Sequence, residues 1–492
     1  MINRTIANLP MNHCKSPLPI SSPVKTVHRY LSSQTDSPNE ALISDVVLVL
    51  TEQRSRSRWN FVKSLYPNGF SPTEVSQITL RIKNNPRLAL RFFLWSEEKS
   101  LCIHDLLSYS TIIHILARSR LKSAAQALIQ KAIRVSESTS PTNPAEPPEL
   151  FRVLAKTYRL CDSAPFVFDL LINACLQAKK IDRAIKIARM LRSRGISPMT
   201  PTCNSLIRSV SQLRGPEDGY EAYKELFGDN VGKVSPNVQT FNTLLLSFYR
   251  HQKMGELKVI RLEMEKFGCQ PNVFSYCILV AASCDDGKIV EAENLWAEMQ
   301  SRRIEPDIMA YNTLLKGLCE NDKVGGAEEL HREMVLREIK PTCVTYEHLI
   351  KGHCKIGDVD SALLLYKDMC RKDFRPEAST VDELIEELCR KKRICEGLKV
   401  LLDVTRMGGF YPSRKSYVFL IVGLCELGKM EEALKLQADM VGKGFGPDTE
   451  IYRAFIGGYI EKGDMDNAKK LETEMLQMGF SATFSTVTIM KR

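Results

Sequence analysis

One stretch of 35 residues decides the fold: Ile308 to Thr342, which reads IMAYNTLLKGLCENDKVGGAEELHREMVLREIKPT. Its apolar side chains recur at helical spacing in two runs, Tyr311 to Leu318 and Ala327 to Met334, with a short polar break between them. Pro341 ends the second run, because proline has no amide hydrogen with which to continue a helix. The stretch therefore predicts a pair of helices joined by a tight turn.

The units on either side share this length and pattern. Val273–Asp307 precedes the stretch and Cys343–Glu377 follows it, each 35 residues long. Further units begin at Pro165, Thr200, Val238, Ala378, Arg414 and Thr449. Such a period indicates repeats that pack only on their neighbours, so a chain of 492 residues needs no single large core. We expect an all-α solenoid of helix-turn-helix repeats.

Recurring polar and small residues predict where the helices begin and break. Hydroxyl residues in phase predict the N-caps of the first helices: Thr240, Ser275, Thr345, Thr380 and Ser416. Glycines in phase predict the break between helices: Gly287, Gly357, Gly428 and Gly463. The unit at Thr200 is three residues too long, and its glycine-containing segment Gly215 to Gly219 is the expected place of the excess.

The periodicity also divides the chain into regions. Before the array, helix starts are predicted at Ser71 and Asn85, and a Ser/Thr/Pro-rich segment at Ser136–Pro148 interrupts the repeats. The predicted regions are an organellar transit peptide (1–31), an N-terminal helical cap region (32–104), a degenerate first repeat (105–134), an insertion or linker with one helix (135–164), an array of about nine repeats (165–483) and a C-terminal tail (484–492).

The first 35 residues contain no Asp or Glu but carry four basic residues and several Ser and Thr. This composition is typical of a transit peptide rather than a secretory signal, which needs an unbroken apolar stretch. Arg29 to Ser33 is similar to a mitochondrial processing site. We therefore expect a mitochondrial protein, with the chloroplast as the alternative.

Charge and cysteine usage limit the possible partners. The net charge is +10, but residues 1–150 hold 18 Lys and Arg against 11 Asp and Glu, so the repeats are nearly neutral. A nucleic acid would have to be held by placed contacts rather than by bulk charge. Five cysteines recur in phase, which indicates packing inside the first helices: Cys284, Cys319, Cys354, Cys389 and Cys425. No CxxC pair and no long apolar run occur, so no metal, cofactor, disulfide or membrane span is expected.

The residues of these units resemble the pentatricopeptide repeat. The stretch Y-N-T-L-L-K-G-L-C, followed by A-E-E-L-H-R-E-M and then I-K-P, carries the resemblance within Ile308–Thr342. It extends over about Leu106 to Thr483, and the uniform length is similar to that of the P-type subclass of plant organelles. The resemblance implies a right-handed superhelix whose first helices line the inner surface. It also implies binding of single-stranded RNA, one base per repeat.

The resemblance assigns base reading to a first-turn residue of each unit together with the last residue of that unit. The pairs that fit are Asn204 with Asn237, Asn242 with Asn272, Asn312 with Thr342, and, in its second member only, Cys277 with Asp307. An apolar residue near the unit's start is expected to wedge between bases, as Phe274, Met309 and Val344 could. The pairs that depart from the pattern are Asp169 with Met199, Glu347 with Glu377, Asp382 with Ser413, Val418 with Asp448, and Arg453 with Thr483. An RNA-reading stretch from Thr200 to Thr342 is therefore expected.

Two functions from different classes are consistent with this pattern. The first is a sequence-selective RNA-binding protein that acts without catalysis in organellar RNA stability, processing, splicing or translation, and the in-phase asparagines favour it.

 The second is a protein-interaction or structural scaffold, for example on an organellar ribosome, which the departing pairs and the near-neutral repeats favour. In both, the chain is expected to be a monomer. An HxE triplet at His331–Glu333 lies within a second helix and has no CxxC partner, so no enzyme is expected.

Overall fold

The computed structural model describes residues 37–52, 57–139, 148–228, 234–406 and 412–480. These residues form 25 α-helices with no strand among them, which confirms the predicted all-α fold. They fall into two compact units, Met1–Pro198 and Met199–Arg492. The predicted transit peptide and the predicted C-terminal tail lie outside the described residues, as does most of the Ser/Thr/Pro-rich segment.

The first unit contains the helices that precede the regular array. They are α1 (Ser37–Glu52), α2 (Arg58–Leu65), α3 (Pro72–Arg81), α4 (Pro86–Glu98), α5 (Leu106–Arg118), α6 (Lys122–Thr139), α7 (Glu149–Thr157), α8 (Phe166–Gln177) and α9 (Ile181–Arg192). Both predicted helix starts are present. Ser71 caps α3 in a reciprocal box with Glu74, and the Asn85 side chain accepts a hydrogen bond of 3.2 Å from the Leu88 amide.

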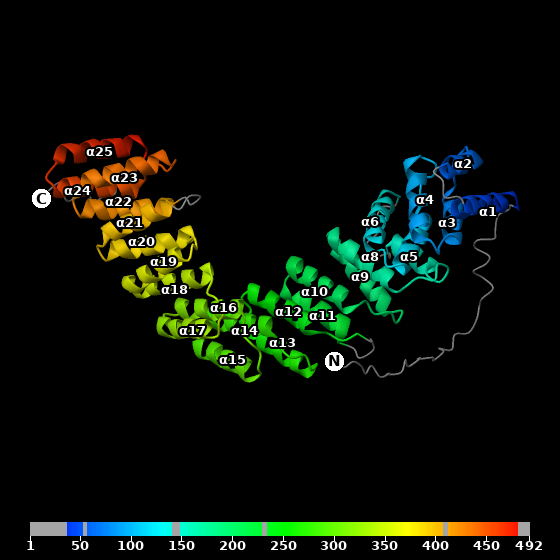
Figure 1. The fold of residues 1–492 in the computed structure, drawn as a ribbon, viewed down its shortest axis with the longest axis horizontal. Coiled ribbons are helices and arrows are strands. Elements are labelled where there is room, and N and C mark those ends of the chain that lie inside the picture. The colour runs from blue at the N-terminus through cyan, green and yellow to red at the C-terminus, as the bar shows by residue number, and fades with distance from the viewer. Residues whose placement is uncertain (1–36, 53–56, 140–147, 229–233, 407–411, 481–492) are drawn as a thin grey trace, which may run out of the picture. The chain divides into compact units, whose positions relative to one another are not determined.

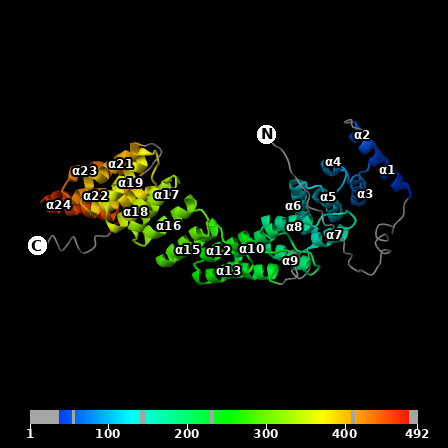
Figure 2. The same cartoon turned by 60° about the horizontal axis from the view of Figure 1, so that its bottom comes forward.

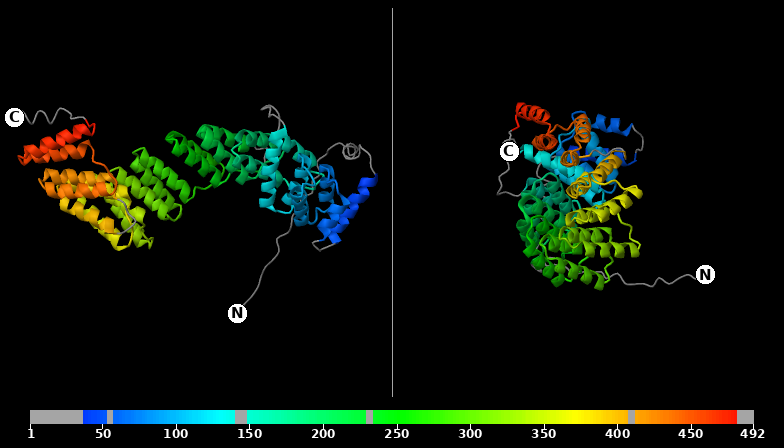
Figure 3. Two further views of the ribbon diagram at one scale, coloured as in Figure 1. Left: turned by 90° about the horizontal axis from the view of Figure 1, so that it is seen from above. Right: turned by 90° about the vertical axis from the view of Figure 1, so that its left-hand side faces the viewer.

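The second unit is a regular stack of helix pairs. Its helices are α10 (Thr200–Arg214), α11 (Pro216–Phe227), α12 (Val238–Arg250), α13 (Met254–Lys266), α14 (Val273–Asp285), α15 (Ile289–Ser301), α16 (Ile308–Glu320), α17 (Val324–Leu336), α18 (Cys343–Ile356), α19 (Val359–Arg371), α20 (Ala378–Arg390), α21 (Ile394–Arg406), α22 (Arg414–Glu426), α23 (Met430–Gly442), α24 (Thr449–Glu461) and α25 (Met465–Gln477). Even-numbered helices are the first helices of the repeats, and each packs on the next even-numbered helix in a continuous row. Figure 1, Figure 2 and Figure 3 show this stack in sequence order.

Glycine and cysteine hold neighbouring first helices together. A Cβ added to Gly317 of α16 would collide with Sγ of Cys284 on α14, and one added to Gly352 of α18 would lie 2.7 Å from Sγ of Cys319 on α16. The in-phase cysteines are therefore packing residues, as expected, and the glycine of the next repeat makes room for them. The predicted break glycines have left-handed backbone, with φ of 72° at Gly287 and 80° at Gly357.

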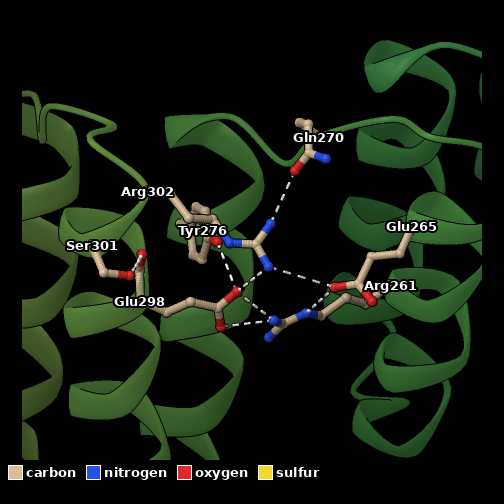
Figure 4. A network of polar contacts seen from close by, with 7 residues as sticks. All are labelled: Arg261, Glu265, Gln270, Tyr276, Glu298, Ser301 and Arg302. Carbon is tan, nitrogen blue, oxygen red and sulfur yellow. Dashed lines mark hydrogen bonds and ion pairs between the residues drawn. The ribbon is translucent and has the colours of Figure 1, made fainter.

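In five repeats a tyrosine of the first helix is tied to an acidic residue of the second helix. Tyr276 donates to Glu298 over 3.0 Å, and Tyr417 donates to Asp439 over 2.8 Å. In Figure 4, Arg261 of α13 and Arg302 of α15 meet at Glu298, each with one nitrogen within 2.8 Å of it. Although burial opposes ionisation, these arginines and the Tyr276 hydroxyl hold the pKa of Glu298 below its usual value. This contact joins one repeat to the next.

Two sequence-based expectations about local structure are wrong. The first helices are capped three residues earlier than predicted, at Asn237, Asn272, Thr342, Glu377 and Ser413 rather than at Thr240, Ser275, Thr345, Thr380 and Ser416. In the first three cases the predicted hydroxyl instead accepts a hydrogen bond from the amide of the cap residue. These three hydroxyls recur in phase because each completes a capping box from the third helical position.

The excess residues of the Thr200 unit also lie elsewhere than predicted. Pro216 begins α11 at the same spacing from Thr200 as Ile289 has from Val273, so the Gly215 to Gly219 segment adds no length. The second helix ends at Phe227, and the longer connection to Val238 includes residues 229–233, outside the described part. Among the described helices, none combines the length and apolar character needed to cross a bilayer.

Candidate nucleic-acid interface

The row of even-numbered helices brings the predicted site residues together in pairs. Asn204, Asn242, Cys277 and Asn312 lie in the first turns of α10, α12, α14 and α16. Their predicted partners are the N-cap residues of the next first helix in each case: Asn237, Asn272, Asp307 and Thr342. Each pair therefore bridges two adjacent first helices, and the pairs follow one another along the row.

Direct hydrogen bonds join the members of the asparagine pairs. Nδ2 of Asn204 donates to Oδ1 of Asn237 over 3.2 Å, and Nδ2 of Asn242 donates to Oδ1 of Asn272 over 3.1 Å. The third pair is looser, with 3.4 Å between Nδ2 of Asn312 and Oγ1 of Thr342. The members of each of these pairs are therefore in contact, although they lie 30 to 33 residues apart in the sequence.

The capping hydroxyls fix the orientation of the first-turn amides. Thr240, Ser275 and Thr345 lie within 2.7 Å of Oδ1 of Asn204, Asn242 and Asn312, respectively, and donate to it. The amide oxygen is therefore occupied from inside the protein. Each first-turn asparagine uses one amide hydrogen toward its partner and keeps the second, since a side-chain amide has two donors.

The N-cap asparagines supply further donors at the surface. Asn237 and Asn272 are exposed, whereas Asn204 and Asn242 are only 2% and 7% exposed. The Oδ1 atoms of Asn237 and Asn272 cap their helices and accept from the paired asparagine, while their Nδ2 groups have no partner among the described residues. A pair of this kind presents N–H donors, which suit carbonyl acceptors on a base edge.

The Cys277 and Asp307 pair has different chemistry. The Cys277 thiol is buried, and burial together with the Asp307 carboxylate raises its pKa to about 11, so the thiol stays protonated at neutral pH. Asp307 is exposed and caps α16 by accepting from the Ala310 amide over 2.8 Å. The pair presents a carboxylate acceptor in place of amide donors.

Carboxylates occupy two of the four equivalent first-turn positions beyond Thr342, at Glu347 and Asp382, whereas Val418 and Arg453 occupy the other two. Oε1 of Glu347 accepts from the Glu377 amide over 2.8 Å, and the buried hydroxyl of Thr380 has no partner among the described residues. Asp382 accepts from the Ser413 hydroxyl over 2.6 Å, and Asp448 pairs with Arg414 at 2.7 Å. Thr483 lies outside the described residues, and Asp169 and Met199 belong to different units.

The expected wedge residues flank the pairs at the surface. Phe274 is half-buried, whereas Met309 and Val344 are 49% and 44% exposed. The equivalent residues Ser379, Lys415 and Glu450 offer no comparable apolar surface. Apolar side chains beside hydrogen-bonding pairs are the arrangement that stacked bases require.

Three grooves lie over the row of first helices. The first groove, lined by Arg208, Asn242, Arg250, Asn272 and Phe274 among others, spans α10, α12 and α14 and has a volume of about 770 Å³. The second groove, of about 760 Å³, contains Cys277, Asp307, Met309, Asn312 and Val344. The third groove spans α16, α18 and α20 with about 470 Å³, and its lining includes Lys316, His348, Lys351, Glu383 and Arg390.

A metal ion requires a set of ligating side chains grouped in space. Among the described residues, no group of three or more His, Cys, Asp or Glu side chains could hold a metal ion. His331 of the HxE triplet forms an edge-to-face contact with Tyr346, and burial lowers its pKa. The grooves therefore offer hydrogen bonds, apolar surface and charge.

Comparison with known proteins identifies the repeats. Models of the PPR repeat family match residues 236–285, 280–320, 306–355 and 341–390, and models of the single PPR repeat match 166–196, 415–445 and 450–480. The matches cover half of the chain and fall on the helices of the repeats. The chain belongs to the PPR repeat family.

Its relatives include plant proteins of the same family. A pentatricopeptide repeat-containing protein of Arabidopsis thaliana is 48% identical over 250 residues, which are 49% of this chain and 50% of that protein. A second, named mitochondrial, is 25% identical over 237 residues, 47% of this chain and 34% of that protein. The matched region spans half or less of the length of these relatives.

Two solved structures align with most of this chain. The crystal structure of PPR10 from maize covers 91% of this chain and 75% of its own length, with 16% identity and a TM-score of 0.41. Yeast Rmd9p, solved in complex with a 16-nucleotide target RNA, covers 83% of this chain and 97% of its own length, with 12% identity and a TM-score of 0.35.

Proposed function

We propose that this PPR protein binds single-stranded RNA and reads pyrimidine bases through the residues from Thr200 to Thr342. The observation that carries the proposal is the repeated asparagine pair, in which a hydroxyl occupies the first-turn amide oxygen and the cap asparagine is exposed, on successive first helices. Because PPR repeats read one base each, a row of such pairs can read successive bases.

Hydrogen-bond chemistry supports the preference for pyrimidines. Uracil and cytosine carry carbonyl oxygens on their pairing edges, and Asn242 with Asn272 offers amide donors to them. Phe274, Met309 and Val344 provide apolar surfaces between consecutive pairs, on which any base can stack. Selectivity then comes from the amides, and part of the affinity comes from stacking.

The remaining features of the proposal follow from the family and the grooves. The protein acts without catalysis, as an adaptor that protects RNA or recruits factors for its processing, splicing or translation. Its uniform repeats suit the P-type subclass, and it acts as a monomer. Several curated relatives are named mitochondrial, which supports a mitochondrial site of action, with the chloroplast as the alternative.

A role in binding proteins is the second candidate for the repeats beyond Thr342. Glu347 and Asp382 place carboxylates at the first-turn positions of two pairs, and Asp448 places one at the cap position of another. These carboxylates repel a phosphate backbone. Such repeats keep the scaffold while presenting a surface better suited to a basic protein partner, such as a component of an organellar ribosome.

Selection from a random RNA pool tests the proposal. The full chain is expected to enrich sequences with consecutive pyrimidines, and Asn242→Ala combined with Asn312→Ala is expected to lower that enrichment. Asn321→Ala provides a matched control, because Asn321 bonds backbone carbonyls at the end of α16 and lies outside the pairs. Retention of RNA without base preference, unchanged by the double substitution, would contradict base reading.

A further inference from the structure

The first groove contains two arginines whose guanidinium groups are free. Arg208 lies on α10 and Arg250 at the end of α12, and both are exposed and line the groove. Neither side chain forms an ion pair or hydrogen bond with any residue that the structure describes. Both therefore remain available to an anion.

Cations of the third groove are already paired with carboxylates. Lys351 lies 3.7 Å from Glu383, and Arg390 contacts Glu387 at 2.6 Å. Lys316 lies 3.6 Å from Glu320. Lys355 is likewise 2.9 Å from Asp322, which lies in the turn between α16 and α17. An incoming phosphate would have to compete with these carboxylates, so the third groove has cations without a surplus of positive charge.

We propose that Arg208 and Arg250 bind backbone phosphates of the RNA strand and anchor it in the first groove. The inference rests on the proposed function and adds the place where the strand is held most tightly. A guanidinium group offers a planar fork of donors that matches phosphate oxygens, and a free one need not break an ion pair first.

The same groove can accommodate the base attached to such a phosphate. Asn242 and Asn272 line it together with Phe274, so pairing donors, a stacking surface and the arginines share one cavity of about 770 Å³. That volume is within the range of sites that hold small ligands, about 300–1,000 Å³. The phosphates and the base are bound by different side chains, so affinity and selectivity can be changed separately.

The salt dependence of RNA binding distinguishes the contribution of phosphate binding from that of base binding. Three proteins are titrated with a fluorescent pyrimidine-rich oligonucleotide at several salt concentrations. They are the unaltered full chain, the double variant Arg208→Ala with Arg250→Ala, and a control double variant, Lys351→Ala with Arg390→Ala. Both double variants remove two positive charges. The arginine variant is expected to lose roughly tenfold in affinity and about 1.4 from the slope of log affinity against log salt, at about 0.7 per phosphate for a single strand. The control is expected to lose little of either.

The base preference provides the second readout. The ratio of affinities for pyrimidine-rich and purine-rich oligonucleotides should be unchanged in the arginine variant, because the asparagine pairs remain. A slope equal to that of the unaltered chain, or an equal loss in the control, overturns the phosphate assignment alone. Failure of the unaltered chain to bind any oligonucleotide overturns the proposed function as well.

Discussion

The first and third grooves are built on the same scaffold but differ in chemistry. In both, adjacent first helices are capped in register, and a residue of one first turn contacts the cap residue of the next helix. In the first groove that contact is Asn242 with Asn272, beside two free arginines. On two helices of the third groove, α18 and α20, it is Glu347 with Glu377, which lie outside the groove lining, and the cations on these helices are held by carboxylates. The difference shows that the packing of the repeats and the chemistry of the groove surface can vary independently.

The largest expected effect tests whether the scaffold is shared. Gly317→Ala and Gly352→Ala each place a methyl group against a cysteine of the preceding first helix. Each is expected to destabilise the protein by about 1–3 kcal/mol, the usual cost of overpacking, measured by denaturant unfolding. Gly325→Ala is the control, because its added Cβ meets no atom within 4 Å. A large cost at only one of the two glycines would contradict a common scaffold.

Acid sensitivity is expected at His348, which lines the second and third grooves but not the first. Burial, together with the positive charges of Lys316 and Lys351, lowers the pKa of His348 to about 4, while Glu377 opposes the shift. The unfolded chain binds a proton at this residue near pH 6.5, so stability is present above that pH and is lost as pH falls from 6.5 towards 4. The contribution is roughly 3 kcal/mol, since the pKa falls from 6.5 to about 4 and each pKa unit corresponds to about 1.4 kcal/mol.

His348→Thr gives the matched variant for that prediction, because Thr243 and Thr313 occupy the same position in earlier repeats. Its unfolding free energy should change less between pH 7 and pH 4.5 than that of the unaltered chain. An identical pH dependence in the two proteins would show that His348 is not held neutral by its surroundings.

Removing one base-reading amide should affect RNA binding only in the first part of the row. Asn204→Ala is expected to weaken binding of the preferred RNA roughly tenfold, or about 1.4 kcal/mol. Thr240 keeps the Asn237 side chain as an acceptor, so the helix cap should survive. Glu347→Ala is the comparison, expected to leave affinity unchanged or slightly higher. Equal losses in the two variants, by fluorescence anisotropy, would remove the distinction between the regions.

The smallest expected effect comes from transferring the asparagine pair. Glu347→Asn with Glu377→Asn would give the Thr380 hydroxyl an acceptor and replace two carboxylates by amides. Affinity for an RNA with one additional pyrimidine should rise a few fold, or about 0.5–1 kcal/mol. The length of RNA protected from nuclease should grow by one nucleotide. No gain with an intact fold would show that the pair alone does not make a reading site.

Much of the fold could be predicted because the repeats carry their signal many times. The periodicity predicts the helix pairs, the glycines between helices and the packing cysteines. Where one unit departs from the pattern, the other units still show it. The N-caps were misplaced because Asn237 and Thr240 are both good capping residues, and only the backbone decides between them. The excess residues near Thr200 were misplaced because Gly215 resembles a loop residue but directly precedes α11.

The candidate site was only partly predictable. The pairs followed from the family pattern, but their hydrogen bonds with Thr240 and Ser275 depend on how adjacent helices align. The free state of Arg208 and Arg250 has no sequence signature, since the paired Lys351 and Arg390 are equally basic in the sequence. Whether a cation is available is decided by carboxylates one turn or one repeat away.

Ultraviolet crosslinking of the full chain to a pyrimidine-rich RNA, with the crosslinked peptides identified by mass spectrometry, tests the central claim most directly. The account predicts that crosslinks fall between Thr200 and Val344 and concentrate around the first groove, near Phe274. Crosslinks that fall mainly between Thr345 and Phe480, or that spread evenly over all the repeats, would contradict it.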